Sequence, residues 1–185
     1  MIYNDVLEGK QIILRSISLS DCNDKYVGWL NDKDVNSFLE SRLSKQTINS
    51  VKDFVKNVIE SDHSYMFAII HKESNDYIGN IKIGPIESNY RNSFIGYLIG
   101  EKKYWGNGLA TEAVFLATKF CFDFLKLHKV RAGVIAQNIG SIKLLEKLNF
   151  IKEARLRENV IINDSYDDVF YYGILENEFK RYISL

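Results

Sequence analysis

The chain has little of what marks several large protein classes. It contains one proline, two cysteines and no surplus of charge, since Lys plus Arg and Asp plus Glu each number 24 among 185 residues. A neutral total disfavours a general binder of nucleic acids or membrane surfaces. No apolar run approaches membrane-spanning length, and residues 1–5 are not a basic and then apolar leader. We therefore expect a cytoplasmic protein that binds neither nucleic acid nor membrane.

The two cysteines give no sign of metal or redox chemistry. Cys22 and Cys121 lie too far apart in the sequence for either kind of motif. Cys121 falls on the apolar face of a predicted helix, where a buried free thiol is the usual outcome. We expect no bound metal. With 46% hydrophobic residues, the chain is most simply one domain spanning residues 1–185, as a monomer or a homodimer.

Hydrophobic periodicity predicts short strands alternating with amphipathic helices. Strands are expected at residues 11–15, 65–70, 77–83, 94–99, 130–135, 151–155, 159–162 and 169–175. Helices are expected after a cap at Ser18 or Ser20, after a cap at Thr47, from about residue 108 and over residues 139–148, with one further turn at 35–39. Pro85 should end its strand or lie at the sheet edge. This order predicts an α/β (α+β) fold, with a mixed, mostly antiparallel sheet of about seven strands and helices on both faces.

The most informative stretch joins the buried strand at 94–99 to the helix that starts near residue 108. Gly106-Asn107-Gly108 connects them, and a glycine-rich loop that enters a helix leaves backbone N–H groups free to bind a phosphate. The Gly-Lys-Ser/Thr of a P-loop is absent, and Thr111 stands where the dinucleotide fingerprint needs a third glycine. The alternative is that the two glycines only permit the turn.

The longer string Lys103-x-x-Gly106-x-Gly108-Leu109-Ala110-Thr111-Glu112-Ala113 resembles the acyl-CoA pyrophosphate loop of the GNAT superfamily, and most of all its RimJ/RimL-like branch, named after ribosomal-protein alanine acetyltransferases. The resemblance implies a GNAT fold with a splayed central strand and acetyl-CoA as co-substrate. Lys103 replaces the family's Arg or Gln and keeps the charge without the planar fork. The implied CoA-binding residues are Leu98, Ile99, Lys103, Tyr104, Trp105, Gly106, Asn107, Gly108, Leu109, Ala110, Asn138 and Ser141.

A second string starts at Asn138 and ends at Phe150. By itself it predicts a helix with Asn138 as N-cap. Ser141 lies at the position that pairs with the N-cap in a capping box. It also resembles the family's Asn-x-x-Ser-x-x-Leu-x-x-Lys-x-Gly-Phe, in which the Asn contacts the pantetheine arm and the Ser lies near the thioester sulfur or the CoA phosphates. Leu145 stands where many family members carry a tyrosine general acid. The resemblance therefore makes Ser141 the candidate that protonates or hydrogen-bonds the leaving thiolate.

Direct transfer to an amine needs a polarised thioester carbonyl, a neutral amine and help for the thiolate. A backbone N–H near Leu98 or Ile99 is the expected polarising donor. The candidate bases are Glu101, Glu87 and Asp168, each of which can equally be a solvated surface charge. Tyr97 either orients the reacting groups or belongs to the core.

The acceptor is predicted from residues 29–42, where GNAT enzymes build the acceptor wall. The substrate residues expected are Trp29, Glu40, Arg42 and Asp168. This stretch resembles acetyltransferases that act on nucleotide-linked amino sugars, with Arg42 on the diphosphate and Glu40 facing the sugar hydroxyls or the amine. We expect a small-molecule amine as acceptor. The alternatives are a protein N-terminus and, in another class, a sensor domain that binds acyl-CoA without turnover.

Overall fold

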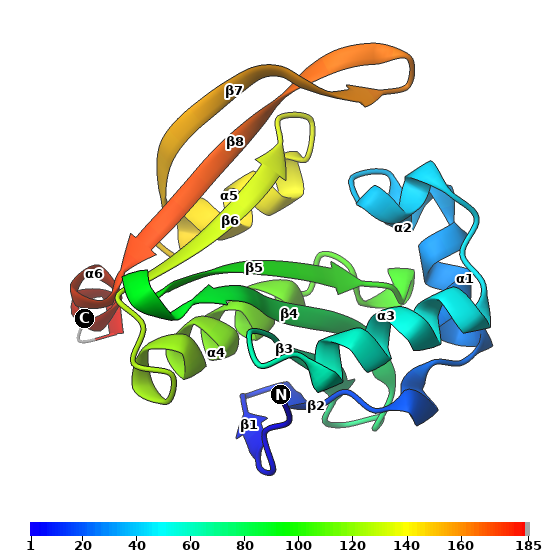
Figure 1. Ribbon diagram of the computed structural model, residues 1–185, viewed down its shortest axis with the longest axis horizontal. Coiled ribbons are helices and arrows are strands. Elements are labelled where there is room, and N and C mark those ends of the chain that lie inside the picture. The colour runs from blue at the N-terminus through cyan, green and yellow to red at the C-terminus, as the bar shows by residue number, and fades with distance from the viewer. Residues whose placement is uncertain (184–185) are drawn as a thin grey trace.

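The computed structural model describes residues 1–183 and contains one eight-stranded sheet (Figure 1). The strands lie in the order β1-β2-β3-β4-β5-β6-β8-β7, and every neighbouring pair is antiparallel except β5 and β6. They are β1 (Val6–Glu8), β2 (Ile12–Ser16), β3 (Tyr65–His71), β4 (Tyr77–Glu87), β5 (Asn92–Ile99), β6 (Lys129–Ile135), β7 (Ile151–Ile162) and β8 (Ser165–Leu175). The predicted α+β class with a mixed, mostly antiparallel sheet is confirmed.

The helices are α1 (Asp24–Asn31), α2 (Lys33–Asn36), α3 (Ile48–Glu60), α4 (Leu109–Asp123), α5 (Ile139–Lys147) and α6 (Glu176–Ile183). Thr47 caps α3 as predicted, because its hydroxyl accepts from the Ser50 N–H and the Ser50 hydroxyl accepts from the Thr47 N–H. The predicted cap of the first helix is wrong. Ser18 is instead the N-cap of a 3₁₀ turn at Leu19–Asp21. Asn23 caps α1, because its side chain accepts from the Tyr26 N–H. Among residues 1–183, no helix is long and apolar enough to cross a bilayer.

Strands β5 and β6 form the central split of the sheet. They pair only through Asn92, Ser93 and Phe94 of β5. Beyond these residues β5 stays paired with β4 and β6 stays paired with β8. Figure 1 shows the two strands diverging, so the carboxyl half of β5 has an edge that no strand covers. The sheet is therefore splayed at its central strand, as the resemblance implied.

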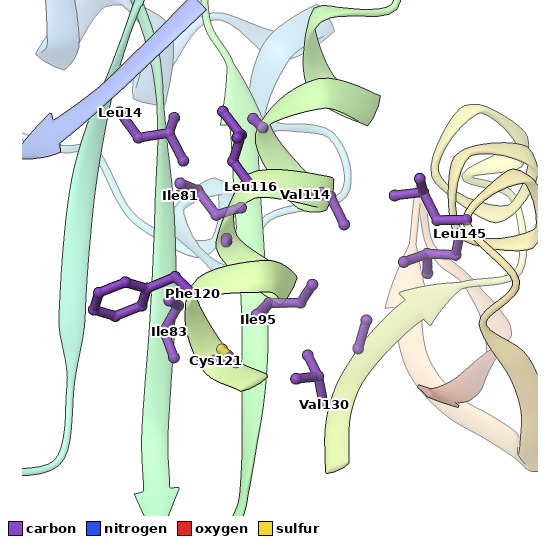
Figure 2. Close-up of a cluster of buried hydrophobic side chains, with 14 of the residues drawn as sticks. Leu14, Ile81, Ile83, Ile95, Val114, Leu116, Phe120, Cys121, Val130 and Leu145 are labelled. Carbon is purple, nitrogen blue, oxygen red and sulfur yellow. The ribbon is translucent and has the colours of Figure 1, made fainter. Parts of the chain in front are cut away.

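The larger core lies between the sheet and helices α4 and α5. Figure 2 shows its centre, which includes Leu14, Ile81, Ile83, Ile95, Val114, Leu116, Phe120, Cys121, Val130 and Leu145. Cys121 is fully buried and its thiol is free, as predicted. Fully burying one such aliphatic or aromatic side chain stabilises a fold by about 1.5–3 kcal/mol. This layer therefore holds β5, β6 and α5 in their relative positions.

A smaller core covers the other face of the sheet. Phe67 and Ile69 of β3 belong to the larger core, but Met66 packs with Val51 of α3 and Trp29 of α1. Alternate residues of a strand face opposite sides, so α1 and α3 lie across the sheet from α4. The helices thus cover both faces, as predicted.

Several local elements differ from the predictions. Strand β1 and helix α6 were not expected. Strand β4 does not end at Pro85 but continues to Glu87 by shifting its register between Ile83 and Ile86. Residues 151–162 form one strand rather than two, because a register shift between Leu156 and Val160 in the pairing with β8 accommodates the polar residues at 157–159. The turn between β7 and β8 has Asn163 and Asp164 both in the left-handed region.

Candidate active site

The loop between β5 and α4 presents a row of unpaired backbone N–H groups. Gly106 and Gly108 both have a φ of +78°, a conformation that L side chains rarely adopt. A Cβ at either position would meet nothing within 4 Å, so backbone conformation rather than crowding requires glycine. Within residues 1–183, the N–H groups of residues 106–111 have no hydrogen-bond partner. These donors and the dipole of α4 form an anion site of the kind that binds a pyrophosphate.

Side chains on either side of this loop fix its position. The Trp105 indole Nε1 donates to the Ile99 carbonyl at 2.7 Å, which ties the loop to the end of β5. The Tyr104 hydroxyl donates to the Asp76 carboxylate at 2.7 Å, and the Lys103 ammonium lies 2.9 Å from the same carboxylate. Hydrogen bonds from Lys103 and Tyr104 hold the pKa of Asp76 well below its usual range. Because Lys103 is already paired, the backbone N–H groups supply most of the loop's uncompensated positive potential.

The open edge of β5 offers further backbone donors. The Gly100 N–H donates to a carbonyl at the start of β4, which places the backbone groups of Gly100 on the β4 side. Because these groups alternate along a strand, Leu98 also faces β4, whereas Tyr97 and Ile99 direct their N–H groups into the split. The geometry therefore favours Ile99 over Leu98 as the donor that polarises a carbonyl there.

Tyr97 and Ser141 meet across the split, with their hydroxyl oxygens 2.6 Å apart. The Asn138 side chain accepts from the Ser141 N–H at 3.1 Å, so the predicted N-cap of α5 is present and uses only the backbone of Ser141. The Ser141 hydroxyl is therefore not used in capping. Burial raises the pKa of Tyr97 to about 12, although the Ser141 hydrogen bond opposes the shift. Tyr97 consequently keeps its proton at neutral pH and is a hydrogen-bond donor.

A cavity of about 400 Å³ lies in the split beside this pair and is called the reaction cavity below. Tyr97, Ser141 and Asn138 line one part of it, and Leu39 and Glu40 line another. Glu40 begins a 3₁₀ turn at Glu40–Leu43 and is the one carboxylate among the described residues of the wall. Its side chain is 78% exposed and lies 3.4 Å from the Arg42 guanidinium, so one of its neighbours already carries a positive charge.

Two predicted site residues bind each other instead of facing the reaction cavity. The Trp29 indole Nε1 donates to the Glu101 carboxylate at 3.1 Å, and the Lys25 ammonium lies 3.4 Å from that carboxylate. Trp29 is only 5% exposed, and a Cβ on Gly100 would lie 1.9 Å from its ring. This packing argues against Glu101 as the general base and against Trp29 as an acceptor contact.

The other candidate carboxylates are also paired. Asp168 accepts from the Glu158 N–H at 2.9 Å and lies 2.5 Å from the Arg155 guanidinium. The Glu158 N–H, and then Arg155, hold the pKa of Asp168 below its usual range. Glu87 lies 3.1 Å from the Arg131 guanidinium. Neither carboxylate lines the reaction cavity, and each has a basic partner instead.

Arg42 lies in a different cavity, of about 390 Å³, together with Lys33 and Lys45. Its guanidinium donates to the carbonyls of Leu39 at 2.8 Å and Ile161 at 3.3 Å. The turn at residues 40–43 is thereby tied to the β7–β8 hairpin. The Arg42 guanidinium also lies 3.4 Å from the Glu40 carboxylate, although the two residues line different cavities.

Gly96 is a site residue that the predictions missed. It lines the reaction cavity, and a Cβ there would meet nothing within 4 Å. An isolated glycine inside a strand pattern often marks a close approach of another group to the backbone. That signal was present in the sequence.

Comparisons with known proteins identify the family. A model of the acetyltransferase (GNAT) domain matches residues 11–151. The chain is also 32% identical over 179 residues to the probable N-acetyltransferase YjcK of Bacillus subtilis, covering 92% of this chain and 97% of that protein. This chain belongs to the GNAT acetyltransferase family. It is an acetyl-CoA-dependent N-acetyltransferase.

Two further GNAT proteins are more distant. The [ribosomal protein uS5]-alanine N-acetyltransferase of Escherichia coli is 24% identical, over 57% of this chain and 54% of that protein. A spermidine N-acetyltransferase from Vibrio cholerae, solved with CoA and spermine, has a TM-score of 0.83 at 21% identity, covering 93% of this chain and 99% of that one. The predicted GNAT family is confirmed, whereas membership of the RimJ/RimL-like branch stays a prediction.

The family comparison gives the Tyr97–Ser141 pair a particular meaning. Leu145 occupies the place of the tyrosine that the family pattern often carries, and here it is fully buried in the larger core (Figure 2). A tyrosine from β5, Tyr97, instead brings a phenol to the split. This GNAT protein therefore has a tyrosine at the split that comes from a different element.

Proposed function

We propose that this GNAT enzyme acetylates a small primary amine by direct attack in the split between β5 and β6. The main support is the Tyr97–Ser141 contact of 2.6 Å in a cavity that also contains the Glu40 carboxylate. The pyrophosphate of acetyl-CoA binds the N–H groups of residues 106–111. The thioester carbonyl accepts from the Ile99 N–H, and Asn138 contacts the pantetheine arm.

The chemistry follows from these positions. Glu40 attracts the ammonium form of the acceptor, and loss of one proton to solvent gives the neutral amine. Its nitrogen attacks the thioester carbon, and the carbonyl oxygen gains a negative charge that the Ile99 N–H stabilises. When the intermediate collapses, the C–S bond breaks and the thiolate accepts hydrogen bonds from the hydroxyls of Ser141 and Tyr97. The second amine proton passes to solvent and solvent supplies one proton to the thiolate, so the products are the amide and free CoA.

A small acceptor is favoured by the size of the reaction cavity, about 400 Å³. The Vibrio cholerae neighbour acts on spermidine, which is also a small amine. The nucleotide-linked amino sugar and the protein N-terminus stay predictions. The first needs a diphosphate near Arg42, whose guanidinium already donates to two backbone carbonyls.

Two measurements test this function. Acetyl-CoA at about 100 times its dissociation constant should stabilise the protein by about 2.7 kcal/mol, which a thermal melt detects. Release of free CoA should then depend on added amine, in a panel of small amines, a nucleotide-linked 4-amino sugar and a peptide with a free alanine N-terminus. Absence of a melting shift would contradict the loop assignment. Transfer to the peptide alone would overturn the small-amine proposal.

A further inference from the structure

A second cavity, of about 420 Å³, lies on the face of the sheet that carries α1 and α3. We call it the side cavity. Most of its wall is apolar: Tyr26 and Leu30 come from α1, Val51 and Phe54 from α3, and Leu98 from β5. Its volume lies within the range of small-ligand sites, which are usually lined by apolar and aromatic side chains with a few polar groups.

The side cavity adjoins the reaction cavity. Leu39, Glu40, Gly96 and Tyr97 line both. Gly96 pairs with Lys82 of β4, and a Cβ at Gly96 would meet nothing within 4 Å, so no side chain separates the two cavities there. A group attached to an amine in the split can therefore enter the side cavity by passing over Gly96.

Two buried polar groups of the side-cavity wall lack partners. Asn80 is 3% exposed, and its carbonyl oxygen accepts from the Tyr77 hydroxyl at 2.8 Å. Its amide nitrogen Nδ2 and the hydroxyl of Ser41 have no hydrogen-bond partner in the part of the chain that the structure describes. Buried polar groups are normally satisfied, so each is available to an oxygen atom of a ligand.

The charges of the side cavity disfavour a polycation. Glu40 is the one carboxylate and Lys82 the one cation among the described residues that line it. The Lys82 ammonium lies 5.6 Å from the centre of the Phe54 ring and forms no ion pair within residues 1–183. Glu40 can match one ammonium group, whereas a second positive charge would face Lys82 and apolar walls.

We infer that the side cavity is the specificity pocket for the acceptor, and that it holds an uncharged aromatic or branched aliphatic group carried by the amine. Asn80 donates from Nδ2 to a hydroxyl or carbonyl oxygen on that group. The inference rests on the proposed function, because it takes the attack on the thioester to occur in the split. It distinguishes this enzyme from one that prefers spermidine.

Four amines test the inference with the intact enzyme and saturating acetyl-CoA. Ethylamine has no group large enough to fill the side cavity, and phenethylamine carries an aromatic ring. Tyramine is phenethylamine with a hydroxyl on that ring, and spermidine is an aliphatic amine with additional positive charges. We expect kcat/KM to rise at least tenfold from ethylamine to phenethylamine, to rise further for tyramine, and to be lowest for spermidine. Equal values for ethylamine and the two aromatic amines, or a preference for spermidine, would overturn the inference.

A pair of variants locates the effect. Ser41→Leu fills the side cavity and removes a hydroxyl that has no partner. Ser37→Leu is the matched control, because Ser37 lines the cavity of Arg42 instead. Ser41→Leu should raise the KM for tyramine at least tenfold and leave that for ethylamine unchanged, whereas Ser37→Leu should change neither. An unchanged KM for tyramine in a folded Ser41→Leu variant would contradict the assignment.

A second variant keeps the test independent of folding at Ser41. Phe54 is 44% exposed, so Phe54→Glu adds a charge to the wall at little risk to the core. It should lower kcat/KM for tyramine and raise it for spermidine, and no change in their ratio would count against the pocket. Failure of all four amines would contradict the proposed function itself. If ethylamine is acetylated but phenethylamine and tyramine show no higher kcat/KM, only the specificity pocket is contradicted.

Discussion

Removing either hydroxyl of the Tyr97–Ser141 pair should slow acetyl transfer and leave acetyl-CoA affinity almost unchanged. Ser141→Ala removes the hydroxyl but keeps the N–H that Asn138 accepts, so the cap of α5 stays intact. Tyr97→Phe keeps the ring in place. Both variants should therefore melt close to the parent.

The size of the effect follows from what the pair does to the thiolate. A hydrogen bond to a charged group contributes about 1.5–3 kcal/mol, which corresponds to a loss of about 10- to 150-fold in kcat. A full general acid would contribute about 10²- to 10⁴-fold. Because burial raises the pKa of Tyr97 to about 12, its own proton is poorly placed to transfer to a thiolate. The lower range is therefore expected.

The assay measures kcat at saturating amine and acetyl-CoA, with the dissociation constant of CoA and the melting temperature as controls. Tyr171→Phe is the matched variant, because Tyr171 lines the same cavity and its hydroxyl forms no hydrogen bond within the described residues. The two hydroxyls contact each other, so the double variant should lose little more than the slower single one. An unchanged kcat in folded Ser141→Ala, or losses that multiply in the double variant, would refute the reasoning.

Two further predictions concern the CoA loop and the fold. Gly108→Asp should weaken CoA binding at least tenfold relative to Gly108→Asn. Both residues tolerate the φ of +78°, but only the Asp carboxylate repels the pyrophosphate. Equal CoA affinities by calorimetry would place the pyrophosphate elsewhere. Asp21 binds Arg15 at 2.6 Å and its side chain is 8% exposed. Burial opposes its ionisation, but Arg15 and the Ser18 N–H outweigh it and lower the pKa of Asp21. Its contribution to stability should therefore be complete above about pH 4 and lost as the pH falls further. Asp21→Asn should lower the unfolding free energy at pH 7 by about 1–3 kcal/mol, since Arg15 is partly exposed. The unfolding free energy of this variant should also depend less on pH in acid. If it falls between pH 5 and pH 3 as steeply as that of the parent, the reasoning is wrong.

Features that depend on neighbours within about four residues were predictable from the sequence. The caps at Thr47 and Asn138 and the start of α4 after Gly108 are examples. The phosphate-binding loop belongs to this group, because two closely spaced glycines and the following helix are enough to leave a row of N–H groups unpaired. Its CoA assignment came from a longer string that resembles one family.

Local sequence patterns predicted element boundaries less well where contact with a distant segment sets the boundary. Pro85 was expected to end its strand or to lie at the sheet edge, but β5 pairs with Ile86 and Glu87 beyond a register shift and extends β4 past the proline. Helix α1 begins later than predicted, because Asp21 binds Arg15 and turns the preceding serines into a separate 3₁₀ element. Propensity and capping rules consider only nearby residues, so they include neither the β5 partner of β4 nor the Arg15 partner of Asp21.

Only the tertiary structure decided which side chains meet at the split. Tyr97 was as plausible in the core as in the site, and the fold brings its hydroxyl to that of Ser141, 44 positions away. Glu101 and Trp29 were both candidates, yet their contact across 72 positions removes them from the reaction cavity. The sequence by itself determined most of the helices and strands, the glycine-rich loop and the family, because these depend on short-range patterns. Which hydroxyl, carboxylate and N–H face the acceptor depends on sheet register and on the splay of β5 from β6, which only long-range packing sets.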